Sequence, residues 1–209
     1  LDITVERADA LIAECEKAGV KLGVFFQERV APGICKLKEL LCAEKLGKLI
    51  LASGRVKWYR PPEYYQSSRW RGTWAYDGGG ALMNQGIHTV DLLLWLVGQV
   101  TRVYGKAITA FHRIQVEDTL VAALEFANGA IGTFEAATSA YPGYRRHLEL
   151  TGTEGTIILE NDRIISAYLR TPLPDVVSEP TEDGNPRASS PVISDTRGHR
   201  KIIEDMLNA

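Results

Sequence analysis

The segment that most constrains the fold of this chain is residues 77–98, DGGGALMNQGIHTVDLLLWLVG. Its three glycines precede about five helical turns, in which apolar residues recur at the spacing of one helix face. These apolar residues are Met83, Ile87, Val90, Leu94 and Val97. Residues 92–97 are apolar all round, which predicts a helix buried on every side. The segment is too short to span a bilayer. The rest of the chain must therefore supply the structure that buries this helix.

A row of three polar residues runs along the same helix. Asn84, His88 and Asp91 stand at positions i, i+4 and i+7, which places them on one side. An unpaired buried polar group costs about 1–3 kcal/mol. We therefore expect these side chains either to hydrogen-bond one another or to face a pocket.

Composition narrows the class of protein. The chain has 209 residues, is 45% hydrophobic and 24% charged, and carries a formal net charge of −2. This is typical of a soluble globular protein with one large domain, or one domain and part of another. The near-neutral charge argues against nucleic acid as a partner. No apolar run approaches ~20 residues and no leader pattern opens the chain, so neither a membrane span nor a secretory signal is expected.

The cysteines indicate the cellular compartment, and the histidines bear on metal binding. Cys15, Cys35 and Cys42 are odd in number and lack metal-ligand spacing, so we interpret them as buried thiols of a reducing compartment and expect a cytoplasmic location. The four histidines are scattered, and no metal site is predicted from them.

The N-terminal residues indicate part of a second domain. Residues 4–19 predict a helix with Thr4 as N-cap and Gly19 as its stop. Residues 20–26, VKLGVFF, form a short β-rich run. A helix and strand of this kind are typical of the last unit of a parallel α/β sheet. We expect residues 1–28 to be the end of a truncated dinucleotide-binding domain, and residues 29–209 to form the main domain, truncated at its own end.

The remainder predicts helices and consecutive β-hairpins. Asn128-Gly129 is a strong hairpin signal, and successive hairpins favour antiparallel pairing. The predicted fold class is α+β: an open, mostly antiparallel sheet with helices on one face, plus the N-terminal α/β remnant. The other, half-apolar face is predicted to join copies into a homodimer or homotetramer. We expect helices at 31–45 and 199–207 (the latter capped by Asp195), strands at 48–59, 101–109, 119–126, 146–151, 156–160 and 163–169, and a long surface loop at 171–196.

Three stretches together resemble one enzyme family. The opening helix–strand unit, GGGALMNQGIHTVDLLLWLVG and TGTEGTIILEND are similar to the Gfo/Idh/MocA oxidoreductases over residues 1–170. The resemblance implies a Rossmann domain followed by a substrate-binding and oligomerisation domain. It implies NAD(P)-dependent oxidation of a CH–OH group in a sugar, polyol or nucleotide-linked sugar acid.

The resemblance also implies residues that this sequence lacks. A catalytic Lys in a Glu-Lys-Pro motif would lie immediately before residue 1, and no G-x-G-x-x-G follows a strand. Most of the NAD or NADP site is therefore missing, and the isolated chain is expected to be inactive. The alternative is a non-catalytic sugar-binding or assembly protein on the same scaffold. A lyase or hydrolase that uses the nicotinamide transiently stays open as a third reading.

His88 is the predicted catalytic residue. It matches the family's histidine, and imidazole titrates near neutral pH; the alternative is a structural histidine bonded to a backbone carbonyl. Asp91 is expected to support it by fixing its tautomer. Asn84 stands where the family commonly has Asp; its amide does not titrate but can orient a substrate hydroxyl. Gln27 and Arg29, after the first strand, are predicted to contact the cofactor, with an interdomain hydrogen bond as the alternative.

The loop at 60–76 is predicted to bind substrate. Aromatic rings stack on sugars, and guanidinium groups bind carboxylates or phosphates. The candidates are Arg60, Tyr64, Arg69, Trp70, Arg71 and Trp74. The alternative is that these rings pack on the sheet and the arginines are solvated. Asn84 together with the Trp-Arg-Gly-Thr-Trp sequence resembles the branch of the family that acts on nucleotide-linked amino-sugar uronates.

Overall fold

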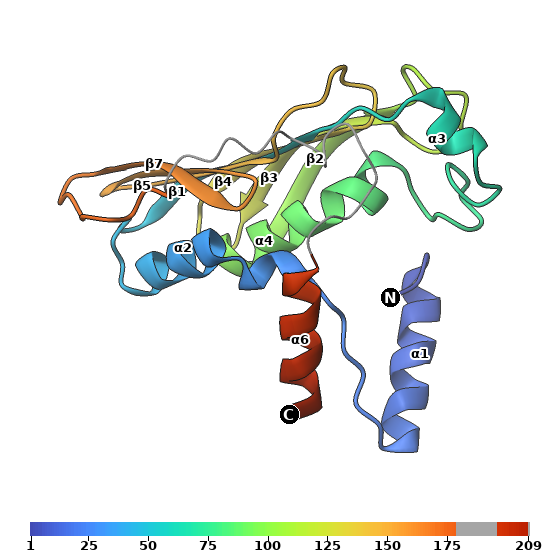
Figure 1. Cartoon of the computed structure of the whole chain (residues 1–209), viewed down its shortest axis with the longest axis horizontal. Helices are drawn as coiled ribbons and strands as arrows, with labels where there is room; N and C mark the ends of the chain where they lie inside the picture. The colour runs from blue at the N-terminus through green and yellow to red at the C-terminus, as the bar shows by residue number, and fades with distance from the viewer. Residues whose placement is uncertain (179–195, 209) are drawn as a thin grey trace.

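The computed structural model describes residues 1–178 and 196–208. Figure 1 shows one open sheet with helices on one of its faces. The sheet has seven strands in the order β2-β3-β4-β1-β5-β6-β7. Its strands are β1 Leu49–Lys57, β2 Val100–Ile108, β3 Thr119–Phe126, β4 Ile131–Ala137, β5 His147–Gly152, β6 Gly155–Glu160 and β7 Arg163–Leu169. The β1–β4 pair is parallel and the other neighbouring pairs are antiparallel. The predicted α+β class with a mostly antiparallel sheet is confirmed.

The predicted hairpin at Asn128-Gly129 joins β3 to β4. Gly129 adopts a φ of +85°, in the left-handed region that glycine tolerates without strain. The side-chain oxygen Oδ1 of Asn128 accepts from the Ala130 N–H at 3.0 Å, and its Nδ2 donates to the Val97 carbonyl at 2.9 Å. The turn therefore fixes the register of two strands and ties them to the end of the central helix.

The helical layer is formed mainly by α2 (Pro32–Cys42) and α4 (Ile87–Val97), with short helices η1 (Gln27–Val30), η2 (Leu82–Gly86) and α3 (Pro62–Gln66). The core lies between these helices and the inner face of the sheet. Its most buried members include Leu37 of α2, Leu150 of β5 and Ile157 of β6, each 0% exposed.

The predicted core stripe of the central helix is wrong in part. Leu94, an expected member, is 43% exposed, so the helix is not buried on every side either. The buried side of α4 instead carries Leu92, Leu93, Leu96 and Val97. The reason is that residues 92–97 are all apolar, so the spacing of apolar residues does not show which side of α4 packs on the sheet. The helix is also preceded by η2, a π-helical turn whose spacing differs from that of an α-helix.

The glycines before this helix permit close contact with the start of β3. A Cβ on Gly80 would lie 1.7 Å from the Glu117 carbonyl oxygen. The Glu117 carboxylate accepts the N–H groups of Gly80 and Leu82, both at 3.0 Å. Glu117 thus satisfies free N–H groups at the start of the helix from another segment, and the missing side chain at position 80 makes room for it.

Gly80→Ala is expected to destabilise the fold by about 3 kcal/mol, the upper end of the cost of overpacking, because the colliding atoms are backbone atoms. Urea unfolding measures the change. Gly105→Ala is the matched control, since a Cβ there meets nothing nearer than 3.4 Å, and it should change stability by less than about 0.5 kcal/mol. Equal costs for the two variants would contradict the steric explanation.

The N-terminal segment differs from the prediction in one respect. Helix α1 (Val5–Ala18) is capped by Thr4 and ends at left-handed Gly19, as expected. Residues 20–26 form no strand, because no described strand of the chain lies beside them to share hydrogen bonds. No residue of α1 is buried. Figure 1 shows α1 and α6 (Arg197–Asn208) extending away from the sheet, with α6 against η1. The predicted cap Asp195 lies outside the described residues.

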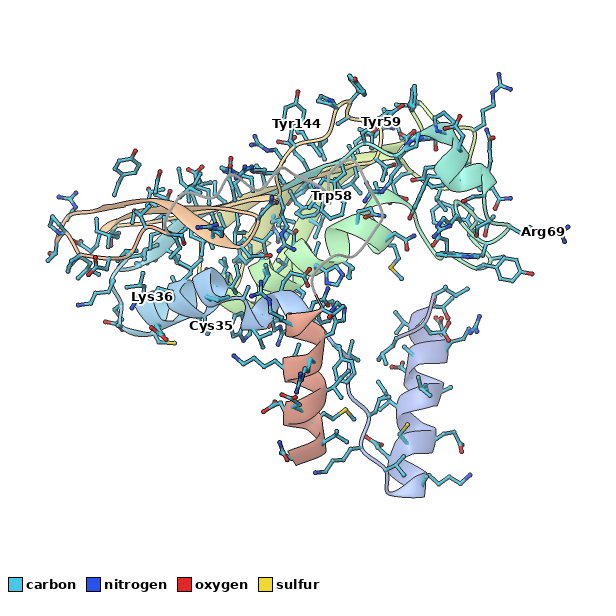
Figure 2. The ribbon with its side chains drawn as sticks, in the orientation of Figure 1. Cys35, Lys36, Trp58, Tyr59, Arg69 and Tyr144 are labelled. Carbon is cyan, nitrogen blue, oxygen red and sulfur yellow. The ribbon has the colours of Figure 1, made fainter. Side chains whose placement is uncertain are left out.

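Helices cover one face of the sheet and leave the other face open. Figure 2 shows Cys35 and Lys36 on α2 and Tyr144 on the opposite side of the sheet. By strand register, that opposite face carries exposed apolar side chains, among them Tyr104, Val121, Ile131 and Tyr168. The cysteines are free, and Cys42 is exposed at the end of α2, so the expectation of three buried thiols is wrong.

Across residues 1–178 and 196–208, no helix has both the length and the apolar character that crossing a membrane requires.

Candidate active site

Two consecutive residues of η1 bind the polar row of α4. Glu28 Oε2 lies 2.8 Å from His88 Nδ1. Arg29 donates to both carboxylate oxygens of Asp91, from Nε at 2.7 Å and from Nη2 at 2.5 Å. His88 and Asp91 therefore take partners about sixty residues earlier in the chain, rather than each other.

Glu28 is buried, with 5% of its surface exposed. Burial favours the neutral acid, but the hydrogen bond with His88 and the positive charge of Arg146 outweigh it and lower the pKa of Glu28 to about 2. An ionised carboxylate only accepts hydrogen bonds, so a neutral His88 that bonds Glu28 through Nδ1 carries its hydrogen on that nitrogen and its lone pair on Nε2. His88 is 29% exposed, with the Phe26 ring edge-on at 5.8 Å, so it is oriented by the protein and open to a ligand.

Asp91 does not have the role expected from the sequence. It pairs with Arg29, and this hydrogen bond raises the pKa of Arg29 against the opposing effect of burial. The carboxylate that lies against His88 Nδ1 is that of Glu28, which sequence reasoning missed. Its only signal was its place beside Arg29, immediately after the apolar run.

The Glu28 carboxylate makes the stability of the protein depend on acid pH. Its pKa falls from 4.5 to about 2 on folding, so its contribution is complete above pH 4.5 and is lost as the pH falls toward 2. One pKa unit corresponds to about 1.4 kcal/mol, so the effect is about 3 kcal/mol. Urea unfolding from pH 5 to 2 should show the wild type losing stability more steeply than Glu28→Gln. Parallel curves would contradict this result.

Asn84 is oriented by a carboxylate that the sequence did not single out. Its Nδ2 donates to Asp77 Oδ1 at 2.5 Å, and the other Asp77 oxygen accepts the Gly72 N–H at 2.7 Å. Because Asp77 is buried and accepts only, the Asn84 amide turns its NH₂ inward and leaves its carbonyl oxygen for a ligand. Asn84 is exposed and lies in the π-helical turn η2, a distortion that is frequent at functional sites.

The aromatic and basic loop holds one arginine between two rings. The Arg71 guanidinium lies 4.5 Å from the Tyr64 ring centre and 4.7 Å from that of Trp70. Trp70 and Trp74 are 45% and 58% exposed, and Figure 2 shows Arg69 at the outer end of the loop. Three of the predicted side chains, Arg69, Trp70 and Trp74, are therefore exposed near a pre-oriented guanidinium.

A cavity of about 670 Å³ lies between this loop and residues 111–115. Its lining includes Arg71, Arg113, Tyr65 and Phe111, and no carboxylate among the described residues. None of the lining residues comes from η1 or α4, so the cavity adjoins the loop and not His88. It suits an anionic ligand with a planar part.

Arg60 is not at the surface, contrary to the expectation of substrate contact. It is 2% exposed, over the Trp58 ring at 5.2 Å and the Tyr64 ring at 5.6 Å. Burial lowers its pKa, and the neighbouring tyrosines oppose this effect. Its side chain therefore packs beneath the loop.

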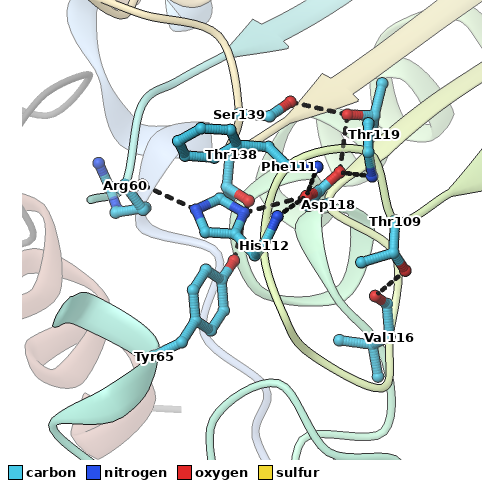
Figure 3. A network of polar contacts seen from close by, with 11 residues as sticks. Arg60, Tyr65, Thr109, Phe111, His112, Val116, Asp118, Thr119, Thr138 and Ser139 are labelled. Carbon is cyan, nitrogen blue, oxygen red and sulfur yellow. Dashed lines mark hydrogen bonds and ion pairs between the residues drawn. The ribbon is translucent and has the colours of Figure 1, made fainter. Parts of the chain in front are cut away.

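The Arg60 carbonyl belongs to a buried network that anchors the loop (Figure 3). It accepts from His112 Nε2 at 2.8 Å, and His112 Nδ1 lies 3.0 Å from Asp118 Oδ2. Asp118 also accepts three backbone N–H groups of residues 110–112. Burial raises the pKa of Asp118, but these bonds outweigh it and lower the value. The group has the fixed contacts of a structural support. Within residues 1–178 and 196–208, no group of three or more potential metal ligands occurs.

Comparison with known proteins identifies the family of this chain. The model of the GFO/IDH/MocA C-terminal domain matches residues 34–158. The uncharacterized oxidoreductase YrbE of Bacillus subtilis is 28% identical over 82% of this chain and 49% of its own length. Myo-inositol 2-dehydrogenase of Thermotoga maritima is 26% identical over 81% of this chain and 50% of its own length.

A solved structure gives a higher identity. The WlbA dehydrogenase from Bordetella pertussis, in complex with NADH and UDP-GlcNAcA, is 37% identical with a TM-score of 0.79, over 83% of this chain and 51% of that one. The chain thus spans about half the length of the relatives it matches. With the domain model matching more than half of its residues, this chain belongs to the Gfo/Idh/MocA oxidoreductase family.

Proposed function

We propose that this chain is the substrate-binding and oligomerisation part of an NAD(P)-dependent oxidoreductase that acts on a CH–OH group. The observation that carries this proposal is the Glu28–His88 pair, which presents an imidazole with a free lone pair at a partly exposed position. The dehydrogenase names of its relatives support the same reaction class.

Oxidation of an alcohol removes a proton from oxygen and a hydride from carbon. His88 Nε2 accepts the hydroxyl proton, and the Glu28 carboxylate stabilises the imidazolium that forms. The nicotinamide, when bound, accepts the hydride. Asn84 accepts a hydrogen bond from a substrate hydroxyl through its outward carbonyl oxygen.

The described residues do not form a dinucleotide site by themselves. Residues 20–26 lie outside the sheet, and no glycine-rich strand–helix turn is present in the sequence. We therefore propose that this chain is inactive alone and that residues 1–28 belong to a Rossmann domain. Gln27 and Arg29 are the proposed cofactor contacts of this chain, for NAD or NADP.

The loop favours an anionic sugar derivative as substrate. Arg69, Arg71 and the cavity arginine Arg113 supply positive charge, and Tyr64, Trp70 and Trp74 supply rings for stacking. Of the candidate substrates, a nucleotide-linked sugar acid uses both properties. WlbA, which was solved with UDP-GlcNAcA, is consistent with that choice. Arg60 is left out of the proposed contacts because it is buried.

The proposal extends to assembly and location. The uncovered sheet face, with its exposed apolar side chains, is proposed to join copies into a homodimer or homotetramer in the cytoplasm. The second candidate function is a non-catalytic sugar-binding or assembly protein. It is favoured by one observation, the amide of Asn84 where the family commonly has a titratable carboxyl group.

The test uses the longer protein that contains this chain, with NAD and NADP and a panel of inositols, sugars and nucleotide-linked uronates. Reduction of cofactor by one class of substrate is the expected result. Sugar binding without reduction of either cofactor would establish the alternative. The 209-residue chain is assayed beside it, and turnover by this chain would contradict the proposed inactivity.

A further inference from the structure

Behind His88 a buried chain of charges connects three elements. Glu28 Oε1, on η1, lies 3.6 Å from Arg146 Nη1, just before β5. The other terminal nitrogen of Arg146 pairs with Asp162 in the turn between β6 and β7. The side chains of Glu28, Arg146 and Asp162 are 5%, 7% and 14% exposed. Charges removed from water in this way act on one another more strongly than surface charges do.

The backbone around Arg146 is also fixed. Its N–H donates to the Asn161 side-chain oxygen at 3.0 Å, and its carbonyl accepts from the Asn161 N–H at 2.9 Å. Asn161 and Asp162 both have positive φ, so this turn has a specific and uncommon conformation. The guanidinium is thus held on both sides, by the turn and by the carboxylate of Glu28.

The protonation state of Glu28 decides which nitrogen of His88 is basic. When ionised, Glu28 accepts from Nδ1–H and the free lone pair lies on Nε2. When neutral, its O–H can donate to Nδ1, and the imidazole hydrogen then moves to Nε2, where no base remains. Burial favours the neutral acid, and a neighbouring cation favours the carboxylate. The groups in contact with Glu28 include His88 of α4, Gln27 of its own helix and Arg146.

We propose that Arg146 is a positioning residue that keeps Glu28 ionised and thereby fixes His88 in the tautomer with its hydrogen on Nδ1. Asp162 and Asn161 hold Arg146 in place, and none of the three touches the substrate. The catalytic meaning of this arrangement rests on the proposed function, whereas the charge arrangement is a property of the chain itself. The competing explanation is that Arg146 only joins the β5–β7 end of the sheet to the helical layer.

Nuclear magnetic resonance on the 209-residue chain separates the two explanations. The variant Arg146→Gln removes the positive charge and keeps a hydrogen-bond donor for Asp162, whereas Arg146→Lys keeps the charge. The control is Arg102→Met, which removes an exposed arginine from the open face of the sheet. In a ¹³C carboxyl titration of the wild type, the pKa of Glu28 should be about 2. The Glu28 pKa should rise by at least about one unit in Arg146→Gln. It should stay at the wild-type value in Arg146→Lys and in Arg102→Met.

The ¹⁵N shifts of the His88 ring are the second readout. The wild type should show the Nδ1–H tautomer, and Arg146→Gln a mixture of both. An unchanged Glu28 pKa and tautomer in folded Arg146→Gln would overturn the proposal. A wild-type Nε2–H tautomer would also overturn it, and this measurement needs no variant to fold.

Activity of the longer protein provides the catalytic readout. Arg146→Gln should lower kcat by at least about 10-fold with little change in KM, because it weakens an acid–base group and not substrate binding. Arg146→Lys should recover most of this loss. If His88→Ala retains full activity, the proposed function fails, and the resonance experiment still decides whether Arg146 controls Glu28.

Discussion

His88→Ala, introduced in the longer protein that contains this chain, is expected to lower kcat/KM by at least about 100-fold, the scale of losing a positioned acid–base group. The reason is that Nε2 of His88 is the atom oriented to receive the hydroxyl proton, since Nδ1 is committed to Glu28. The loss should appear in kcat more than in KM, because proton transfer belongs to the transition state. Initial rates of cofactor reduction against substrate concentration give both constants.

His147→Ala is the matched control for this measurement. His147 also pairs with a glutamate, Glu149, but it belongs to β5 and the open face of the sheet. Its activity should stay near that of the wild type, with circular dichroism and size-exclusion chromatography showing that both variants fold and assemble. If His88→Ala keeps at least a third of the wild-type activity, His88 has only a structural role and the proposed chemistry is wrong.

The second large expected effect concerns the ion pair of Arg29 and Asp91: loss of Arg29 should lower the stability of the fold far more than loss of Asp91. Arg29 and Asp91 form a bidentate pair in which the Asp91 side chain is 7% exposed and that of Arg29 is 41% exposed. Arg29→Met leaves a buried carboxylate without its cation, which typically costs about 3–5 kcal/mol. Asp91→Asn leaves a guanidinium that water already reaches, so we expect a loss of about 1 kcal/mol. Urea unfolding at neutral pH measures both.

The double variant Arg29→Met/Asp91→Asn tests the explanation. It should be clearly more stable than Arg29→Met alone, because the unpaired buried charge is gone. Simple addition of the two single costs would show that the pair is not coupled. Because η1 also carries Glu28, loosening of this helix should weaken the orientation of His88 as well.

The strands were predictable because their signals are local. Residues 119–126 and 163–169 form β3 and β7 with the predicted bounds, since alternation and turn residues act over a few positions. The helix phase was not predictable. Residues 92–97 are all apolar, so hydrophobic spacing alone reveals neither which side of α4 is buried nor the π-helical turn at Leu82–Gly86 that precedes it.

The residues of the candidate site also include some that the sequence predicted and some that it did not. The sequence identified His88, Asn84, Arg29 and the arginine-rich loop by residue type and by resemblance. It missed Glu28, Asp77 and Arg146, whose roles depend on contacts with distant segments. It also assigned Arg60 to substrate binding, whereas the fold buries this side chain against the rings of Trp58 and Tyr64.

The sequence by itself determined the α+β class, the hairpins, the family and the imidazole on the central helix, because each is written in residue types a few positions apart. The tertiary structure alone decided which partner each polar residue of that helix received. Glu28 rather than Asp91 lies against His88, and Asp77 orients Asn84. The physical reason is that burial favours a partner for nearly every polar group, and only the folded chain shows which partner lies within reach.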